Sequence, residues 1–519
     1  MHRYVLAVAS GLALWLAFPS YNLWPMAPVG VALLALSTHR ASPWQGAQLG
    51  LISGMSCFLP LLSWSGIYVG ALPWVALATL ESSYVALLGL VCAVLQPSSL
   101  LRRGTSVAGQ VRPVIVALVW VGQETLRGTT PFGGFPWGRL AFSQADSPLV
   151  ALAALGGAPA LTFGVALTGG LLAAGVARLT RASRQHGIPV GGARFAGGAL
   201  IAGAVALMFL PLLIPRPSDG PTGRFLAIQG NVPRSGLDFN AERRLVLDNH
   251  ARATRQSAAA VAAGTQPRPD LVVWPENASD IDPVRNSDAA AVITAAVDAI
   301  KAPLVLGAVL REPPPNVSNA SLLYLPGKGL TARYIKQHPA PFAEYIPYRP
   351  FFRLFSDKVD LLATDFAAGS GAGVFRVPAS DGGTIAAGAI ICFEVAYDGL
   401  VRDTVDHGAN VLLVQTNNAT FGFTDESVQQ LAISRIRAIE HGRSIVHVST
   451  VGVSAMITPD GTAHQRTKLF TPAVLAADLP LRTERTLADR VGALPEILAG
   501  GGVGLLLVLH GLGRARRRR

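Results

Sequence analysis

Three residues of complementary chemistry lie near the ends of predicted strands in the second half of the chain. Glu276 follows Trp274-Pro275, Lys336 lies in the run 333–338, and Cys392 follows the apolar run 386–391. A carboxylate can take the proton of a thiol, the thiolate can attack a carbonyl carbon, and an ammonium can stabilise the oxyanion that forms. These residue types indicate acyl transfer through a thioester, although sequence spacing does not show that they meet.

Each of the three also has an ordinary structural interpretation. A lone cysteine at a strand end is commonly a small buried hydrophobe, Glu276 alone is a carboxylate at a strand end, and Lys336 alone is a solvated charge. Cys392 is the only cysteine outside the predicted membrane segments, because Cys57 and Cys92 lie within them. Three cysteines in 519 residues exclude a disulfide framework.

The region around these residues alternates between short β-rich runs and helical stretches. Such alternation predicts a layered α/β domain with buried strands. The turn 326–329 joins two strand-like runs and predicts a hairpin. The predicted strands are 225–228, 271–274, 304–309, 321–324, 385–392, 411–414 and 445–448, and the predicted helices are about 240–263, 285–301, 398–408 and 426–442.

The composition predicts that much of the remaining chain lies in a membrane. Half of the residues are hydrophobic and only 14% are charged, whereas soluble chains carry nearer a quarter charged residues. A bilayer core needs about 20 apolar residues per helix. Eight apolar windows are found, at roughly 4–20, 21–38, 46–65, 70–97, 112–126, 148–177, 195–214 and 491–512.

The distribution of arginine predicts the topology. Fourteen of the 43 Lys and Arg residues lie in segments that contain no Asp or Glu. If eight helices span the membrane, all fourteen lie on the same side of it. They are Arg3, Arg40, Arg102, Arg103, Arg112, Arg178, Arg181, Arg184, Arg194, Arg514, Arg516, Arg517, Arg518 and Arg519. Short positive loops stay cytoplasmic. Both termini are therefore expected in the cytoplasm. The other 29 basic residues nearly balance the 31 acidic ones, so the net charge of +12 reflects topology and predicts no nucleic-acid partner.

Three regions follow from this topology. Residues 1–215 form a membrane domain of seven helices, 216–490 form an extracytoplasmic domain, and 491–519 form a last transmembrane helix with an Arg-rich cytoplasmic tail. The protein is expected in the cytoplasmic (inner) membrane. Glu81 lies inside an apolar window, where a carboxylate is a candidate functional residue unless it sits near the interface.

Several ordered motifs resemble the nitrilase superfamily, and together with seven helices before the domain and one after it they resemble the apolipoprotein N-acyltransferase family. The motifs are Trp274-Pro275-Glu276, Tyr334-x-Lys336-x-His338-x-x-Pro341-Phe342-x-Glu344-Tyr345 and Cys392-Phe393-Glu394, with further matches at 131–137, 229–233, 417–422 and 435–443. The resemblance covers nearly the whole chain and implies an α-β-β-α sandwich.

The resemblance also implies roles for individual residues. Glu276 would be the general base, Lys336 the oxyanion stabiliser and Cys392 the nucleophile. Glu344 and Glu394 match supporting carboxylates. Position 393 is Phe where many relatives have Tyr, so only its backbone N–H is expected to serve the oxyanion.

The same resemblance implies the substrates. The acyl donor would be a membrane phospholipid, and the acceptor would be the N-terminal α-amine of a diacylglyceryl-modified apolipoprotein, with no metal or cofactor. A tryptophan expected soon after 229–231 is missing, and Phe239 is a candidate replacement as an apolar wall. Phe342 and Tyr345 are further candidates for substrate binding. The apolar segment 345–362 is predicted to be a lid or lipid-facing arm, or else a loop buried against the sandwich.

Two other functions compete with acyl transfer to a protein. A membrane-tethered nitrilase-type amidase or hydrolase would use the same nucleophile with water as acceptor. The eight predicted helices favour the transferase, because a soluble substrate needs at most one anchor. A polytopic transporter or scaffold with a non-catalytic sandwich would not need Glu276, Lys336 and Cys392 together.

Overall fold

The computed structural model describes residues 1–96, 111–184, 190–232 and 242–518. Phe239, Arg102, Arg103 and Arg519 lie outside the described residues. The chain divides into two compact units: the first comprises Met1–Gly66, Gly70–Pro215 and Arg490–Arg519, and the second comprises Ile67–Val69 and Arg216–Asp489.

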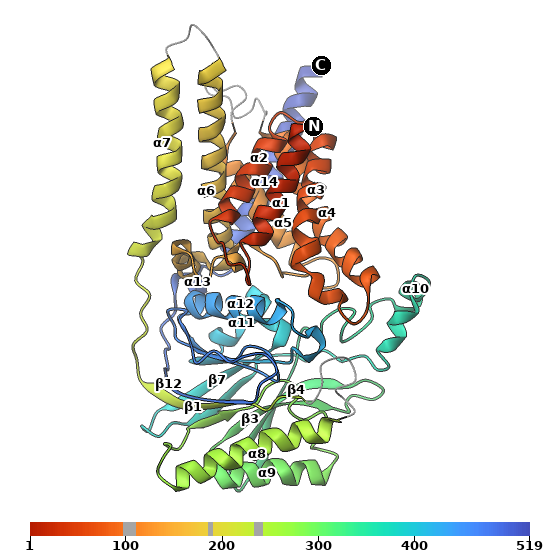
Figure 1. The fold of residues 1–519 in the computed structure, drawn as a ribbon, viewed down its shortest axis with the longest axis vertical. Helices are drawn as coiled ribbons and strands as arrows, with labels where there is room; N and C mark the ends of the chain where they lie inside the picture. Colours follow the sequence, from red (N-terminus) through yellow and green to blue (C-terminus); the bar gives the residue numbers. More distant parts are fainter. Residues whose placement is uncertain (97–110, 185–189, 233–241, 519) are drawn as a thin grey trace. The chain divides into compact units, whose positions relative to one another are not determined.

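The first unit is helical (Figure 1). Its long helices are α1 (His2–Leu16), α2 (Met26–Thr38), α3 (Pro43–Leu61), α4 (Ala71–Leu95), α5 (Pro113–Arg127), α6 (Ala153–Arg184), α7 (Val190–Phe209) and α14 (Leu494–Arg518). Each overlaps one of the eight apolar windows. Among the described residues, four stretches are long and apolar enough to cross a membrane: Ala71–Leu95, Pro148–Arg181, Gly192–Leu213 and Leu494–Arg516. Eight spans therefore stay a prediction.

Glycines allow close packing of α3 against α4. A Cβ atom on Gly89 would lie only 2.1 Å from the carbonyl oxygen of Gly46, and one on Gly50 would lie 2.2 Å from the carbonyl oxygen of Val85. Small residues at such contacts let two helix backbones approach, which is typical of helix pairs in membranes.

The second unit contains two six-stranded sheets. The first has the order β12-β1-β2-β3-β4-β5 and the second β11-β10-β9-β8-β7-β6. The strands of the first sheet are β1 (Thr222–Gln229), β2 (Leu271–Val273), β3 (Leu304–Leu310), β4 (Ser318–Leu325), β5 (Gly329–Ile335) and β12 (Ala473–Pro480); those of the second are β6 (Val374–Pro378), β7 (Thr384–Ile391), β8 (Val411–Thr416), β9 (Ser444–Ser449), β10 (Ala455–Ile457) and β11 (Ala463–His464). All seven predicted strands and the hairpin between β4 and β5 are confirmed.

Two apolar layers hold this unit together. One lies between the sheets and includes Phe225, Val273, Ile385 and Leu413. The other packs the opposite face of the first sheet against α8 (Arg243–Ala262) and α9 (Ser287–Ile300). Alternate residues of a strand point to opposite faces, so Phe225 enters the first layer while Leu226 enters the second.

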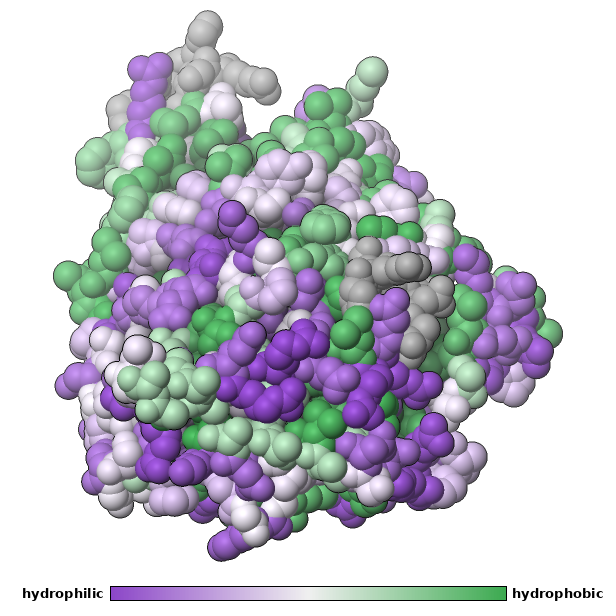
Figure 2. All heavy atoms as spheres, turned by 60° about the horizontal axis from the view of Figure 1, so that its bottom comes forward, coloured by the Kyte–Doolittle hydropathy of each residue, from purple (hydrophilic) through white to green (hydrophobic). Residues whose placement is uncertain are grey.

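Helices cover both outer faces of the pair of sheets. In Figure 1, α8 and α9 lie beneath one sheet, and α11 (Asp398–Asp406) and α12 (Glu426–His441) lie above the other. Figure 2, turned so that this side comes forward, shows hydrophilic side chains interspersed with apolar patches. Arg244, Arg252 and Arg255 of α8 are exposed. The expected α-β-β-α sandwich is confirmed.

Candidate active site

Three loops that follow strands bring the predicted chemical groups together. Glu276 lies three residues beyond β2, Lys336 directly follows β5, and Cys392 directly follows β7. The Nζ atom of Lys336 lies 3.4 Å from Oε1 of Glu276. The Cys392 thiol is close enough to the Glu276 carboxylate to hydrogen-bond it. Glu276 and Lys336 are 4% and 2% exposed, so both charges are held away from water.

Glu344 and Asn319 complete the polar cluster. Nζ of Lys336 lies 2.8 Å from Oε2 of Glu344. The Asn319 side-chain amide, from β4, donates to Oε1 of Glu276 at 2.7 Å and to Oε1 of Glu344 at 3.1 Å. Sequence reasoning found Glu344 but missed Asn319. Asn319 could have been found from its position in a predicted buried strand, because a buried polar side chain needs hydrogen-bond partners.

Glu394 ties the loop of Lys336 to the loop of Cys392. Its carboxylate accepts hydrogen bonds from the backbone N–H groups of Ile391, Gln337 and His338 and from the hydroxyl of Tyr334. The two loops come from β7 and β5, which belong to different sheets. Glu394 is fully buried and therefore fixes the separation of nucleophile and cation.

The backbone at Cys392 is held in the left-handed region, with φ of 54°. A non-glycine residue in this conformation costs about 1–2 kcal/mol. A short 3-10 helix, Cys392–Ala396, begins at the cysteine. This turn ends β7 at Ile391, one residue earlier than predicted, and turns the chain away from the strand direction.

Burial and charge set the protonation of the cluster. Burial, with the Glu276 carboxylate second, raises the pKa of Cys392 well above its usual value. Burial also raises the pKa of Glu276, against the opposing effect of Lys336. Burial by itself lowers the pKa of Lys336, but the carboxylates of Glu344 and Glu276 raise it well above its usual value. The resting site therefore holds a neutral thiol beside a carboxylate of increased basicity and a permanent ammonium.

A second group of polar residues approaches the thiol from α12 and the loop after β8. Nε2 of Gln430 donates to Sγ of Cys392 at 3.6 Å. Asn418 donates to Glu426 at 2.6 Å and to Gln430 at 3.1 Å. Sequence reasoning assigned no role to Glu426 or Gln430, because polar residues on a predicted helix are ordinarily its solvated face.

Comparison with known proteins identifies the family. The model of the apolipoprotein N-acyltransferase N-terminal domain matches residues 10–171, and the carbon-nitrogen hydrolase model matches residues 240–489. An apolipoprotein N-acyltransferase of Mycolicibacterium smegmatis is 40% identical to this chain over 97% of the chain and 85% of its own length. The chain belongs to the apolipoprotein N-acyltransferase family. A second member, from Geobacter metallireducens, is 29% identical over 94% of this chain and 91% of its own.

Among solved structures, an amidase from Nesterenkonia sp. is similar to part of this family member. The match covers 53% of this chain and 96% of the amidase chain, with 19% sequence identity and a TM-score of 0.37.

Aromatic side chains border the polar cluster of this N-acyltransferase family member. The Phe393 ring packs edge-on against Tyr397, with centroids 5.4 Å apart, and Tyr397 stacks on His338 at 4.4 Å. Phe342 is exposed and packs edge-on against Phe352. Tyr345 is half-buried, and its carbonyl oxygen accepts the backbone N–H of Phe342 at 2.7 Å.

The segment 345–362 presents apolar side chains to its surroundings. It includes the short helix α10 (Arg349–Arg353), which has no buried residue. Tyr348, Phe351, Leu354, Phe355 and Leu361 are all more than half exposed. A loop buried against the sandwich is therefore the wrong interpretation for these side chains, and the lipid-facing arm stays a prediction.

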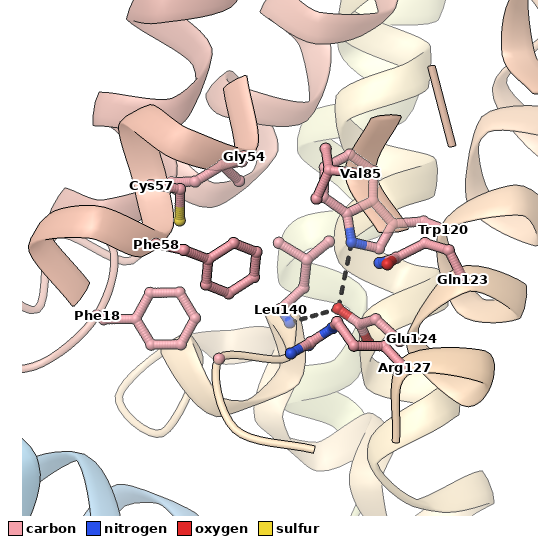
Figure 3. A pocket seen from close by; sticks show the side chains of 12 residues that line it. Phe18, Gly54, Cys57, Phe58, Val85, Trp120, Gln123, Glu124, Arg127 and Leu140 are labelled. Atoms are coloured by element: carbon pink, nitrogen blue, oxygen red, sulfur yellow. Dashed lines mark hydrogen bonds between the residues drawn. The ribbon is translucent and has the colours of Figure 1, made fainter. Parts of the chain in front are cut away.

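Glu81 is buried among helices of the first unit and pairs with Arg127. The Arg127 guanidinium also donates to the carbonyl oxygens of Phe135 and Trp137. Glu124, one turn before Arg127, accepts the indole N–H of Trp120 and the backbone N–H of Leu140 (Figure 3). The adjoining cavity has room for about 20 Å³ of solvent, enough for a single water. These contacts indicate a role in holding the loop 128–140.

Proposed function

We propose that this chain transfers a fatty acyl chain from a membrane phospholipid, through a thioester on Cys392, to the N-terminal α-amine of a diacylglyceryl-cysteine on an apolipoprotein. Membership of the apolipoprotein N-acyltransferase family supports the overall reaction. The observation that carries the mechanism is the convergence of a thiol, a buried carboxylate and a buried ammonium at three strand ends.

In the first half-reaction, Glu276 takes the proton of the Cys392 thiol as the sulfur attacks the ester carbonyl of the phospholipid. The transfer moves a negative charge from the carboxylate to the sulfur without changing the net charge of the buried cluster, so little new desolvation cost arises. The Lys336 ammonium, with the backbone N–H of Phe393, stabilises the oxyanion. Collapse of the intermediate forms the thioester, and the lysophospholipid alkoxide leaves with the proton held by Glu276.

In the second half-reaction, the neutral α-amine of the acceptor attacks the thioester carbonyl. Glu276 takes a proton from the attacking nitrogen, and the oxyanion again faces Lys336. The C–S bond breaks, the amide leaves, and the Cys392 thiolate recovers the proton from Glu276. The cycle therefore regenerates the resting site.

The remaining residues position these groups. Glu344 anchors the Lys336 ammonium, and Glu394 holds the loops of Lys336 and Cys392. Phe342 and Tyr345 are proposed to contact an acyl chain, as is Phe239. The exposed apolar segment 345–362 is proposed to contact lipid, since contiguous apolar surface marks membrane or ligand contact.

We propose that all eight helices span the cytoplasmic membrane, with residues 216–490 outside the cytoplasm and both termini inside. The arginine distribution supports this topology. In a Cys392→Ser background, a membrane-impermeant maleimide should label Gly327→Cys in intact cells and leave Ala515→Cys unlabelled. Labelling of Ala515→Cys would contradict the topology.

Intact-mass spectrometry tests the chemistry directly. After incubation with phospholipid vesicles, the purified protein should gain the mass of a fatty acyl group that hydroxylamine removes, and Cys392→Ser should not. Addition of a diacylglyceryl-cysteine peptide should then move label from phospholipid to peptide. Release of free fatty acid without labelled peptide would instead support hydrolysis.

A further inference from the structure

The thiol of Cys392 has a hydrogen-bond donor that the mechanism above does not use. Nε2 of Gln430 lies 3.6 Å from Sγ, which is within range for a bond to sulfur. Gln430 lies on α12 and is fully buried. It therefore approaches the sulfur from an element that carries neither Glu276 nor Lys336.

A chain of hydrogen bonds fixes which end of the Gln430 amide faces the sulfur. The hydroxyls of Thr416 and Ser449 both donate to Oδ1 of Asn418, at 2.9 Å and 2.5 Å. In this arrangement the carbonyl oxygen of Asn418 accepts from the two hydroxyls, and its Nδ2 group points the other way.

The orientation of Asn418 in turn sets the orientation of the Gln430 amide. Nδ2 of Asn418 donates to Oε1 of Gln430 at 3.1 Å and to Oε2 of Glu426 at 2.6 Å. With its oxygen committed to Asn418, Gln430 presents its NH₂ group to Cys392. The side chains of Asn418, Glu426 and Gln430 are almost fully buried, so water does not compete for the contacts among them, whereas Cys392 is partly exposed.

We propose that Gln430 is a further catalytic residue, which donates from Nε2 to the Cys392 sulfur when the sulfur is a thiolate. Asn418 is its positioning residue. The inference rests on the proposed function, because it assigns Gln430 to both half-reactions of acyl transfer.

The donor is suited to this reaction because the charge on the sulfur changes along it. A thiolate is a strong acceptor, because hydrogen bonds to charged groups are stronger than those between neutral groups, while the sulfur of a thioester is a poor acceptor. The bond is strongest when sulfur attacks the phospholipid and again when sulfur leaves the acylated amine. It adds little to the acyl-enzyme between them, so Gln430 lowers both barriers without trapping the intermediate.

The surroundings of the thiol oppose formation of the thiolate, and the Gln430 donor acts against them. Burial and the carboxylates of Glu276 and Glu426 raise the pKa of Cys392, whereas Lys336 and the hydrogen bond from Gln430 lower it. Burial raises the pKa of Glu426 to about 8, so this carboxyl is mostly neutral at pH 7. The Gln430 amide has no charge of its own and therefore stabilises the thiolate at any pH.

Alkylation of Cys392 by iodoacetamide, without any substrate, tests the inference in the full-length protein in detergent. At pH 8, Gln430→Met should react about tenfold more slowly than the wild-type protein, because loss of the donor raises the thiol pKa by about one pH unit. Gln430→Glu keeps the shape of the side chain but replaces the donor with a carboxylate, so it should react more slowly still. Asn418→Ser, which frees the Gln430 amide to turn, should show a smaller decrease.

Gln256→Met is the matched control, because Gln256 is an exposed glutamine on α8, and it should leave the rate unchanged. Thioester formation from phospholipid is measured in parallel. Normal alkylation rates in both Gln430 variants would overturn the inference, even if acyl transfer fell. Failure of the wild-type protein to form any thioester would overturn the proposed function while leaving the alkylation result readable.

Discussion

The ammonium nitrogen of Lys336 lies 2.8 Å from Oε2 of Glu344, closer than to any other carboxylate oxygen around it. Lys336 and Glu344 are eight residues apart, on opposite sides of a turn that is closed by a hydrogen bond from the Ala340 backbone N–H to Oε2 of Glu344. The cation is therefore paired mainly with a residue that we do not expect to exchange protons. Glu276, at the longer distance, stays available as a base.

Replacement of Glu344 by Gln should slow thioester formation by roughly 10²–10³-fold, the usual cost of losing one element of oxyanion stabilisation. Without Glu344, Lys336 would pair fully with Glu276, and the base would become weaker. Single-turnover acylation by phospholipid, followed by mass spectrometry, measures the effect. Glu484→Gln removes a carboxylate that is 84% exposed and should be neutral; an unchanged rate in Glu344→Gln would contradict the role.

The variant Glu276→Gln should affect alkylation and catalysis in opposite directions. Burial and the Glu276 carboxylate raise the pKa of Cys392. Removal of the carboxylate leaves burial but lowers the thiol pKa, so the thiolate fraction at pH 8 rises and iodoacetamide reacts faster. Acyl transfer should nonetheless be lost, because no base remains. Alkylation slower than in the wild-type protein would show that Glu276 activates the resting thiol by itself.

Glu394→Gln should destabilise the second unit. The carboxylate accepts bonds from three backbone N–H groups and one hydroxyl. An amide has one oxygen, and its NH₂ group would face donors, leaving at least one buried N–H without an acceptor at a cost of about 1–3 kcal/mol. Thermal unfolding in detergent measures this loss. A midpoint equal to that of the wild-type protein would show that the two loops are held by other contacts.

The buried pair Glu81–Arg127 should be sensitive to removal of one partner only. Glu81→Gln leaves a buried guanidinium without its counter-charge, which typically costs about 3–5 kcal/mol. The double variant Glu81→Gln/Arg127→Met should recover part of the loss. Asp360→Asn breaks the pair Arg353–Asp360, whose side chains are 66% and 43% exposed, and should cost about 1 kcal/mol or less. Equal unfolding midpoints for the two single variants would contradict the structural role of Glu81.

Substitution of Phe351, Leu354 and Phe355 by Ser should weaken the use of donors embedded in a bilayer. We expect a higher KM for phospholipid vesicles and no change in kcat for a water-soluble short-chain thioester donor, because the side chains lie outside the polar cluster. Leu245→Ser, at an exposed leucine on α8, is the matched control. An equal loss with both donors would show that the segment shapes the catalytic cluster instead.

Much of this protein was determined by its sequence alone. Period-two and buried apolar runs specify strands, and the predicted strands and the hairpin at 326–329 occur as expected. The sequence also predicts that Glu276, Lys336 and Cys392 lie near the ends of strands, and they follow β2, β5 and β7. Strands β6, β10, β11 and β12 were not predicted. Pairing with a neighbour decides their conformation: β12, at the edge of its sheet, pairs along its whole length with β1, from Thr222↔Pro480 to Gln229↔Ala473.

The tertiary structure alone decided which polar residues share the site. Asn319, Asn418, Glu426 and Gln430 are polar residues of ordinary type in a strand, a loop and a helix, and nothing in their spacing relates them to Cys392. Gln430 contacts the thiol, Asn418 contacts Glu426 and Gln430, and Asn319 contacts the carboxylates of Glu276 and Glu344. These contacts form because residues far apart in the chain are packed together, where each buried polar group must find a partner. Burial, which no local pattern measures, also raises the pKa values of the Cys392 thiol and the Glu276 carboxylate.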